Sequence, residues 1–344
     1  MKTKVFVFLF LLIVLAGFHT VNDSLFEVPK GWPKPQHDFL KKPLLKETVE
    51  LGRALFYDQI LSRNNSVSCA SCHSQYTAFT HVDHALSHGI DDRIGKRNSP
   101  ALMNLAWQKS FMWDGAVNHI EVQALAPISN PLEMDENISS VVKKLNATVQ
   151  YQKLFYKAFG DSAITGERTL KAISQFMLTL VSSNSKYDSV MRKETHFNAQ
   201  ENRGYNLFKK HCSSCHTEPL FTNDRFENNG LPVDTSLMDK GRYAITQNPK
   251  DSLLFKVPTL RNIEFSYPYM HDGRFKKLSD VLKHYSNGIT HSPTLSKELL
   301  GPIVMTSEER VDIIAFLLTL TDKTFLFDKR FSYPKTFFSD PAKD

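Results

Sequence analysis

Four cysteines form two short motifs of the same kind, and each motif ends in a histidine. The first motif spans residues 69–73 (CASCH) and the second spans residues 212–216 (CSSCH). In a C-x-x-C-H motif, two thiols on one turn reach the two vinyl groups of one haem, and the adjacent imidazole lies under the iron. The sequence therefore predicts two covalently bound haem c groups. The attachment and proximal residues are Cys69, Cys72 and His73, and Cys212, Cys215 and His216.

Three other uses of paired cysteines fit less well. Zinc sites made from two C-x-x-C pairs usually place the pairs about 15–20 residues apart, whereas Cys72 and Cys212 are 140 residues apart. Zinc also gives no reason for a histidine after both pairs. A redox dithiol needs one motif in a thioredoxin-like setting, and a disulfide across so short a loop would be strained.

The composition is that of an ordinary globular protein. The chain has 344 residues, of which 41% are hydrophobic and 23% are charged. These values exclude disordered, collagenous and multi-span membrane proteins. Four cysteines are too few for a disulfide-dense scaffold. A net charge of +6 without a run of Lys or Arg gives no reason to expect a nucleic-acid partner.

The beginning of the chain has the pattern of a secretion signal. The basic start Met1–Lys4 precedes an apolar run, Val5–Gly17, that is short for a membrane span. We therefore expect residues 1–20 to be a cleaved signal peptide. The mature protein is expected in the periplasm without stable membrane insertion. An uncleaved N-terminal anchor is the alternative.

The surroundings of the two haem motifs repeat. The segments Gly52–Phe56 and Gly204–Phe208 share the pattern G-x-x-L-F and precede the two motifs. The segments Phe176–Leu180 and Phe316–Leu320 share the pattern F-x-L-T-L and follow them. Each segment is expected to belong to an amphipathic helix. The order of helix, haem motif, long middle and helix occurs twice, which indicates an internal duplication.

The last of these helices has a clear predicted start. Thr306 is a candidate N-cap and Glu309 follows three residues later, as in a capping box. Strand-like alternation is scarce, so we predict a mainly α fold of two small, cytochrome c-like helical haem domains with long loops. The polar stretch 191–199 suits a boundary between an N-terminal domain, residues 21–190, and a C-terminal domain, residues 191–344.

Five further motifs lie between and after the haem motifs. They are Arg97–Pro100 (RNSP), Phe111–Gly115 (FMWDG), Gln123–Met134 (ending in NPLEM), Val257–Asn262 (VPTLRN) and Tyr267–Gly273 (YPYMHDG). In this order, and with two C-x-x-C-H motifs, the chain resembles the bacterial di-haem cytochrome c peroxidases and their relative MauG. The resemblance covers the chain from about Leu51 to Leu320.

The resemblance implies a division of labour between the two halves. Peroxide reacts at the N-terminal haem, and the C-terminal haem passes electrons. Glu133 then matches the distal acid–base carboxylate, Gln123 its distal companion, and Trp113 the tryptophan that conducts between the haems. A desolvated carboxylate can move a proton from one peroxide oxygen to the other. A solvated loop acid is the plainer interpretation of Glu133, and a core aromatic is that of Trp113.

Two axial positions depart from typical peroxidases. A loop histidine caps the N-terminal haem in those proteins. His88 is the best candidate here, although a surface histidine is the alternative. Fourteen residues after His271, where a methionine ligand is usual, the chain has Tyr285. MauG also uses a tyrosine at the matching place. A phenolate stabilises ferric iron and lowers the haem potential. Other candidate ligands are Met270, Met305 and His284.

The resemblance also implies a calcium site and leaves the assembly open. Asn98 and the backbone carbonyls of Ser266 and Pro268 match the family's calcium ligands. Oxygen donors suit this hard cation. Family members are commonly dimers, so a homodimer is a possible assembly that no feature of the sequence defines.

Three functions follow from these residues. The first is a periplasmic di-haem cytochrome c peroxidase that reduces hydrogen peroxide to water with electrons from a small cytochrome c or cupredoxin. The second is a MauG-like oxidase that modifies side chains of a partner protein, which Tyr285 favours. The third is a plain di-haem electron carrier. Glu133 and Gln123 argue against the third, because a carrier needs no distal acid–base pair.

Overall fold

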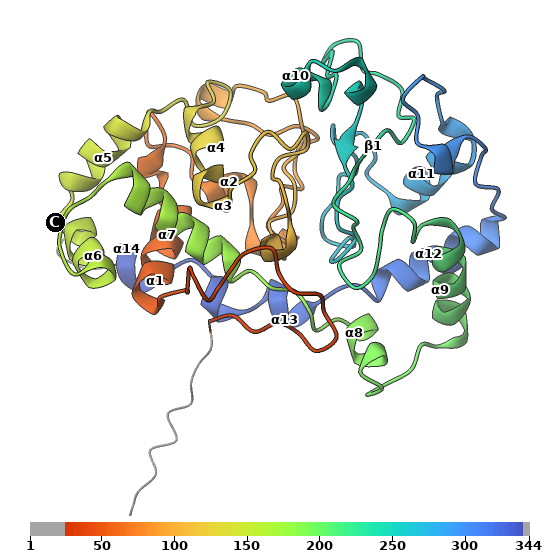
Figure 1. The fold of residues 1–344 in the computed structure, drawn as a ribbon, viewed down its shortest axis with the longest axis horizontal. Helices are drawn as coiled ribbons and strands as arrows, with labels where there is room; N and C mark the ends of the chain where they lie inside the picture. The colour runs from red at the N-terminus through yellow and green to blue at the C-terminus, as the bar shows by residue number, and fades with distance from the viewer. Residues whose placement is uncertain (1–24, 340–344) are drawn as a thin grey trace, which may run out of the picture.

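The computed structural model describes residues 25–339, which form two helical lobes (Figure 1). The predicted signal peptide, residues 1–20, lies outside the described residues. The only sheet in residues 25–339 pairs two strands of two residues each, β1 (Phe226–Glu227) and β2 (Phe255–Lys256). The predicted mainly α class with long loops is therefore confirmed. Within the described part of the chain, no helix has the length and apolar character to cross a bilayer.

The helices follow the chain in two groups. The first group is α1 (Lys46–Tyr57), α2 (Cys69–Cys72), α3 (Ile120–Gln123), α4 (Leu125–Ser129), α5 (Ile138–Asn146), α6 (Val149–Phe159), α7 (Gly166–Leu178) and α8 (Lys186–Met191). The second group is α9 (Ala199–His211), α10 (Tyr243–Thr246), α11 (Leu278–Lys283), α12 (Ser307–Leu318), α13 (Lys323–Leu326) and α14 (Lys335–Phe338).

The predicted duplication is visible in the way the long helices pack. Helix α1 packs against α7 in one lobe, and α9 packs against α12 in the other. A glycine at each crossing allows the two helix backbones to approach each other closely. A Cβ atom at Gly52 would overlap the carbonyl oxygen of Ala172, and a Cβ atom at Gly204 would overlap that of Asp312. The repeated G-x-x-L-F pattern thus marks two equivalent helix crossings.

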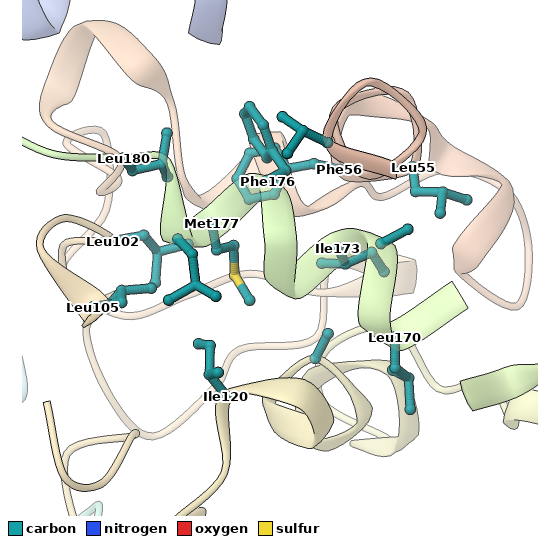
Figure 2. Close-up of a cluster of buried hydrophobic side chains, with 14 of the residues drawn as sticks. Leu55, Phe56, Leu102, Leu105, Ile120, Leu170, Ile173, Phe176, Met177 and Leu180 are labelled. Carbon is teal, nitrogen blue, oxygen red and sulfur yellow. The ribbon is translucent and has the colours of Figure 1, made fainter. Parts of the chain in front are cut away.

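The larger core lies around the crossing of α1 and α7. Figure 2 shows Leu170, Ile173, Phe176 and Met177 along α7, and Phe56 of α1 beside them. The Phe56 and Phe176 rings are 5.2 Å apart. The smaller core of the second lobe is built in the same way from α9 and α12. Its buried members include Tyr187, Phe208, Phe221, Ile313, Phe316 and Leu320.

The start of α12 agrees with the sequence. Thr306 is the N-cap, and its hydroxyl accepts a hydrogen bond from the Glu309 backbone N–H at 3.1 Å. The Glu309 carboxylate accepts one in return from the Thr306 N–H at 2.8 Å. The predicted capping box is therefore confirmed.

The last described residues return to the first lobe. Helices α13 and α14 run back along the molecule, as the blue end of the ribbon shows (Figure 1). The Phe325 ring lies 5.7 Å from that of Phe79, and the Tyr57 hydroxyl donates to the Phe331 carbonyl at 2.7 Å. By sequence these residues belong to the predicted C-terminal domain, but they complete the core of the N-terminal one.

Candidate functional site

A cavity of about 800 Å³ collects nearly all the predicted site residues. Its volume lies towards the upper end of the roughly 300–1,000 Å³ typical of small-molecule sites. Both lobes contribute to its wall. The predicted site residues that line it are Cys72, His73, Asn98, Trp113, Gln123, Glu133, Cys212, Cys215, His216, Ser266, Pro268 and Tyr285. Cys69 lies one turn from Cys72 on α2, and His88 is not part of the wall.

The histidine of the first haem motif is prepared to act as a ligand. His73 Nδ1 lies 2.8 Å from the carbonyl oxygen of Phe79. A carbonyl can only accept, so Nδ1 carries the hydrogen and Nε2 keeps its lone pair. Burial lowers the pKa of His73 to about 4, so the ring is neutral near pH 7. A neutral imidazole with one free nitrogen is the form that binds iron.

The second haem motif has the same arrangement. His216 Nδ1 lies 3.1 Å from two carbonyl oxygens, those of Phe221 and Pro258. Burial again lowers the pKa of His216 to about 4. No disulfide joins any of the four cysteines. In residues 25–339, no three His, Cys, Asp or Glu side chains converge on a point that could hold a metal ion. The residues of each motif therefore fit the attachment and proximal ligation of one haem.

Glu133 is held in the cavity wall by its own loop. The Asn130 side-chain amide donates to Glu133 Oε1 at 2.8 Å, and the Glu133 N–H donates to the Asn130 carbonyl at 2.9 Å. The side chain is largely buried, and this burial raises the pKa of Glu133, although the Asn130 hydrogen bond opposes the rise. A carboxyl group with a raised pKa can both accept and return a proton near neutral pH.

The loop that contains His88 packs against the backbone of Glu133. The Ile90 N–H donates to the Glu133 carbonyl at 2.8 Å. Gly89 allows this approach, because a Cβ atom there would lie 2.6 Å from the Cα atom of Glu133 and would overlap the Leu132 carbonyl oxygen. No sequence pattern marks Gly89 for this role, because the contact depends on two loops that meet only in the fold.

The imidazole of His88 does not line the cavity. Its Nδ1 contacts the Asp92 carboxylate at 2.7 Å, and its ring stacks on that of His84 at 4.2 Å. The His88 carbonyl instead faces the haem motif and accepts a hydrogen bond from Cys72 Sγ at 3.6 Å. Axial ligation by His88 remains a prediction, and it would require this loop to turn the ring inward.

Gln123 and Trp113 occupy other parts of the wall. Gln123 ends α3, and its amide contacts the Met112 sulfur at 3.6 Å. The Trp113 indole N–H donates to the Asn98 carbonyl at 2.8 Å, which fixes the ring in the wall. The Trp113 carbonyl accepts from the Lys256 N–H of the second lobe at 2.7 Å. Trp113 therefore lies where the two lobes are joined.

Of the four candidate ligands in the second lobe, the cavity wall includes Tyr285 and Met270. Tyr285 lies in a π-helical segment, His284–Gly288, a feature that is frequent at functional sites. His284 is buried and its Nε2 contacts the Asn229 carbonyl at 2.9 Å, whereas Met305 belongs to the core. Burial raises the pKa of Tyr285 to about 12, and a hydrogen bond with the Asn229 side chain opposes the rise.

The predicted calcium ligands lie together at one edge of the cavity. The Asn98 side-chain amide donates to the Pro268 carbonyl, and Ser266 lines the same wall. The Pro268 carbonyl, one of the three predicted ligands, therefore accepts a hydrogen bond from another of them. A calcium ion here remains a prediction.

A second repeat was missed in the sequence. The segments FMWDG (111–115) and YMHDG (269–273) have the same backbone, with Met112 at φ 70° and Met270 at φ 76°. Helices α3 and α11 each begin five residues after the glycine of these segments. In this alignment of the two repeats, Pro127 occupies the position equivalent to Tyr285, and both residues line the cavity. Proline offers no ligating atom, so the two halves of the cavity differ at this position.

The comparisons with known proteins agree with the geometry. A family model described as di-haem cytochrome c peroxidase matches residues 46–196, and a cytochrome c model matches residues 201–321. These matches confirm the two cytochrome c-like domains. The chain is 37% identical to the methylamine utilization protein MauG of Methylorubrum extorquens, over 86% of this chain and 83% of that protein.

Two further relatives cover most of the chain. A cytochrome c551 peroxidase of Nitrosomonas europaea is 34% identical over 80% of each protein. A solved structure of a MauG-like protein associated with microbial copper homeostasis is 32% identical, with a TM-score of 0.79 over 90% of this chain and 99% of that one. Both peroxidases and MauG proteins are therefore among its relatives.

Proposed function

Because the chain belongs to the family of di-haem cytochrome c peroxidases and MauG, we propose that it uses hydrogen peroxide as an oxidant and another protein as its source of electrons. The first candidate activity is that of a periplasmic cytochrome c peroxidase. One peroxide, two electrons from a small cytochrome c or cupredoxin, and two protons give two waters. The observation that carries the proposal is the largely buried Glu133, which lines the same cavity as His73.

The haem groups supply a binding site for peroxide and one-electron chemistry when they are bound. His73 and His216 would hold the two irons through Nε2, because the Nδ1 atom of each is used by backbone carbonyls. The thiols of each motif would fix the groups covalently. Apart from Cys69, which lies one turn from Cys72 on α2, these side chains line the cavity.

Glu133 moves the proton in the proposed reaction. Its ionised carboxylate accepts the proton of one peroxide oxygen and donates it to the other oxygen, which leaves as water when the O–O bond breaks. Asn130 holds Oε1 at 2.8 Å, so the other carboxylate oxygen is left to face the substrate. The Gln123 amide is proposed to orient the peroxide. Pro127, the counterpart of Tyr285 in the repeat, has no side-chain atom that could bind iron in this half of the cavity.

Trp113 and Tyr285 are proposed to control electron transfer to the N-terminal haem site. Trp113 joins the lobes through Asn98 and Lys256, and we propose that its ring conducts between the two haem sites. Tyr285 is proposed as a second residue that would hold the C-terminal haem, because it lines the cavity whereas its neighbour His284 does not.

The second candidate activity is MauG-like oxidation of a partner protein, and Tyr285 is the observation that favours it. A phenolate ligand would lower the potential of the C-terminal haem. A low potential makes this haem a poor acceptor for electrons from a small cytochrome. The oxidising equivalents would then be used on side chains of a partner. The relatives named MauG support this candidate.

The test is a carboxyl-to-amide substitution in the haem-loaded protein. Glu133→Gln is expected to keep both haems and the fold, yet to slow the peroxide reaction by roughly two orders of magnitude or more. Glu121→Gln makes the same chemical change on α3, where Glu121 binds Lys42 outside the cavity, and should leave the rate unchanged. A normal rate in Glu133→Gln would remove Glu133 from the mechanism.

A further inference from the structure

Lys256 is a cavity-lining cation that none of the roles above uses. It lies in β2, where its backbone N–H donates to the Trp113 carbonyl at 2.7 Å. Its ammonium group reaches across to the first lobe and donates to Gln108 Oε1 at 2.7 Å and to the Ser110 carbonyl at 2.6 Å. The side chain therefore lies at the junction of the two lobes, next to the residue proposed to connect the haem sites.

No carboxylate of residues 25–339 is bound directly to the Lys256 ammonium group. Both hydrogen-bond acceptors of its ammonium group are neutral. Asp114 and Asp224 act on it electrostatically, but Asp114 binds Arg97 at 2.6 Å and Asp224 binds the Lys109 N–H at 2.6 Å. Burial lowers the pKa of Lys256 to about 8.

Arg97 lines the same wall and, unlike Lys256, has carboxylates bound to its charged group. Its guanidinium group contacts two carboxylates, those of Asp114 and Asp239, each at 2.6 Å. A buried charge is costly unless a counter-charge lies close to it. Within the described part of the chain, Lys256 has no counter-charge in direct contact, so a further partner of its ammonium group should be an anion.

We propose that Lys256 binds a propionate carboxylate of one haem and thereby sets the potential of that haem beside Trp113. Haem brings two such carboxylates into the cavity, and an ammonium ion with one N–H still available can donate to one of them. The inference depends on haem occupancy of the cavity, which the family establishes, and not on which protein is the electron partner.

The charge has a direct consequence for redox chemistry. A cation near a haem favours the reduced state, because the oxidised iron carries the additional positive charge. Removal of the charge should therefore lower the midpoint potential of the haem that it contacts. At a separation of several ångströms in the wall of the cavity, the equilibrium constant for reduction should fall roughly tenfold or more.

The experiment compares three variants of the haem-loaded protein. Lys256→Met removes the charge and keeps the length of the side chain, Lys256→Arg keeps the charge, and Lys157→Met removes an exposed lysine of α6 that does not line the cavity. The midpoint potentials of both haems are measured by spectroelectrochemical titration. Resonance Raman spectra report the propionate bending bands.

Lys256→Met is expected to lower one midpoint potential and to shift the propionate band of that haem. Lys256→Arg should restore most of the potential and of the propionate band position, and Lys157→Met should change neither of them. Two loaded haems with unchanged potentials and bands in Lys256→Met would overturn the proposal. If that variant fails to take up haem, the contact between Lys256 and the propionate is tested in a crystal structure of the unmodified holo-protein. A propionate oxygen within about 4 Å of Lys256 Nζ supports the proposal, and a longer distance contradicts it.

Discussion

The hydrogen bond from Asn130 to Glu133 should set the pH range of the peroxide reaction. Burial raises the pKa of Glu133, and the Asn130 amide opposes this rise by donating to Oε1 at 2.8 Å. Asn130→Ala removes that donor and leaves burial unopposed. The pKa of Glu133 should therefore rise further in the variant.

The size of the effect follows from the type of bond. A hydrogen bond to a charged group contributes about 1.5–3 kcal/mol, and one pKa unit corresponds to about 1.4 kcal/mol. Because water can replace part of the lost bond, we expect an increase of about one pKa unit. The reaction needs the ionised carboxylate, so activity is present above this pKa and lost as the pH falls through it. The acidic limb of the pH profile should move about one pH unit upward.

The assay follows peroxide-dependent oxidation of a reduced small cytochrome c at stepped pH, relative to the unmodified protein. Asn130 Oδ1 also accepts from the Leu132 N–H at 3.0 Å, so Asn130→Asp keeps this turn while it removes the donor. Both variants should shift the limb upward. Ser129→Ala, which removes a hydroxyl bonded to the Leu125 carbonyl, should not shift it. An acidic limb at the original pH in both Asn130 variants would show that another group is the base.

Three further substitutions test other parts of the structure. Gly204→Ala would force a methyl group against the Asp312 carbonyl, so we expect a loss of about 1–3 kcal/mol in the free energy of unfolding, measured by urea titration. Gly89→Ala should displace the Glu133 loop and lower the rate of the peroxide reaction while both haem spectra are retained. Tyr285→Met should raise the midpoint potential of the C-terminal haem and speed electron uptake from a small cytochrome. An unchanged potential in this variant would mean that another side chain binds the iron.

Much of the fold could be predicted because its signals are local. The two C-x-x-C-H motifs define two haem sites through the spacing of three residues. The capping box at Thr306 marks the start of α12 through contacts within one turn. The glycines at 52 and 204 repeat because each helix crossing needs the same close approach.

The features that were missed depend on contacts between distant segments. The sequence alone left Tyr285, His284, Met270 and Met305 open as ligands, and the π-helical segment decides which of its two neighbouring residues faces the cavity. Lys256 has no motif that would distinguish it from other lysines. Its position follows from the pairing of β2 with β1 and from the hydrogen bond between Lys256 and the Trp113 carbonyl.

The return of the C-terminal segment to the first lobe is a similar case. The phenylalanines of α13 and α14 resemble those of any helical core, and nothing in their spacing says which core they complete. Only the packed structure places Phe325 against Phe79.

The most direct measurement of the central claim is the oxidation of a reduced small c-type cytochrome by hydrogen peroxide with the purified, haem-loaded protein as catalyst. The proposed peroxidase should turn over continuously and oxidise two cytochromes for each peroxide consumed. A change in the haem spectrum on adding peroxide, without oxidation of the cytochrome, would contradict the peroxidase and favour oxidation of a partner protein. No spectral change at all would contradict peroxide chemistry at this site.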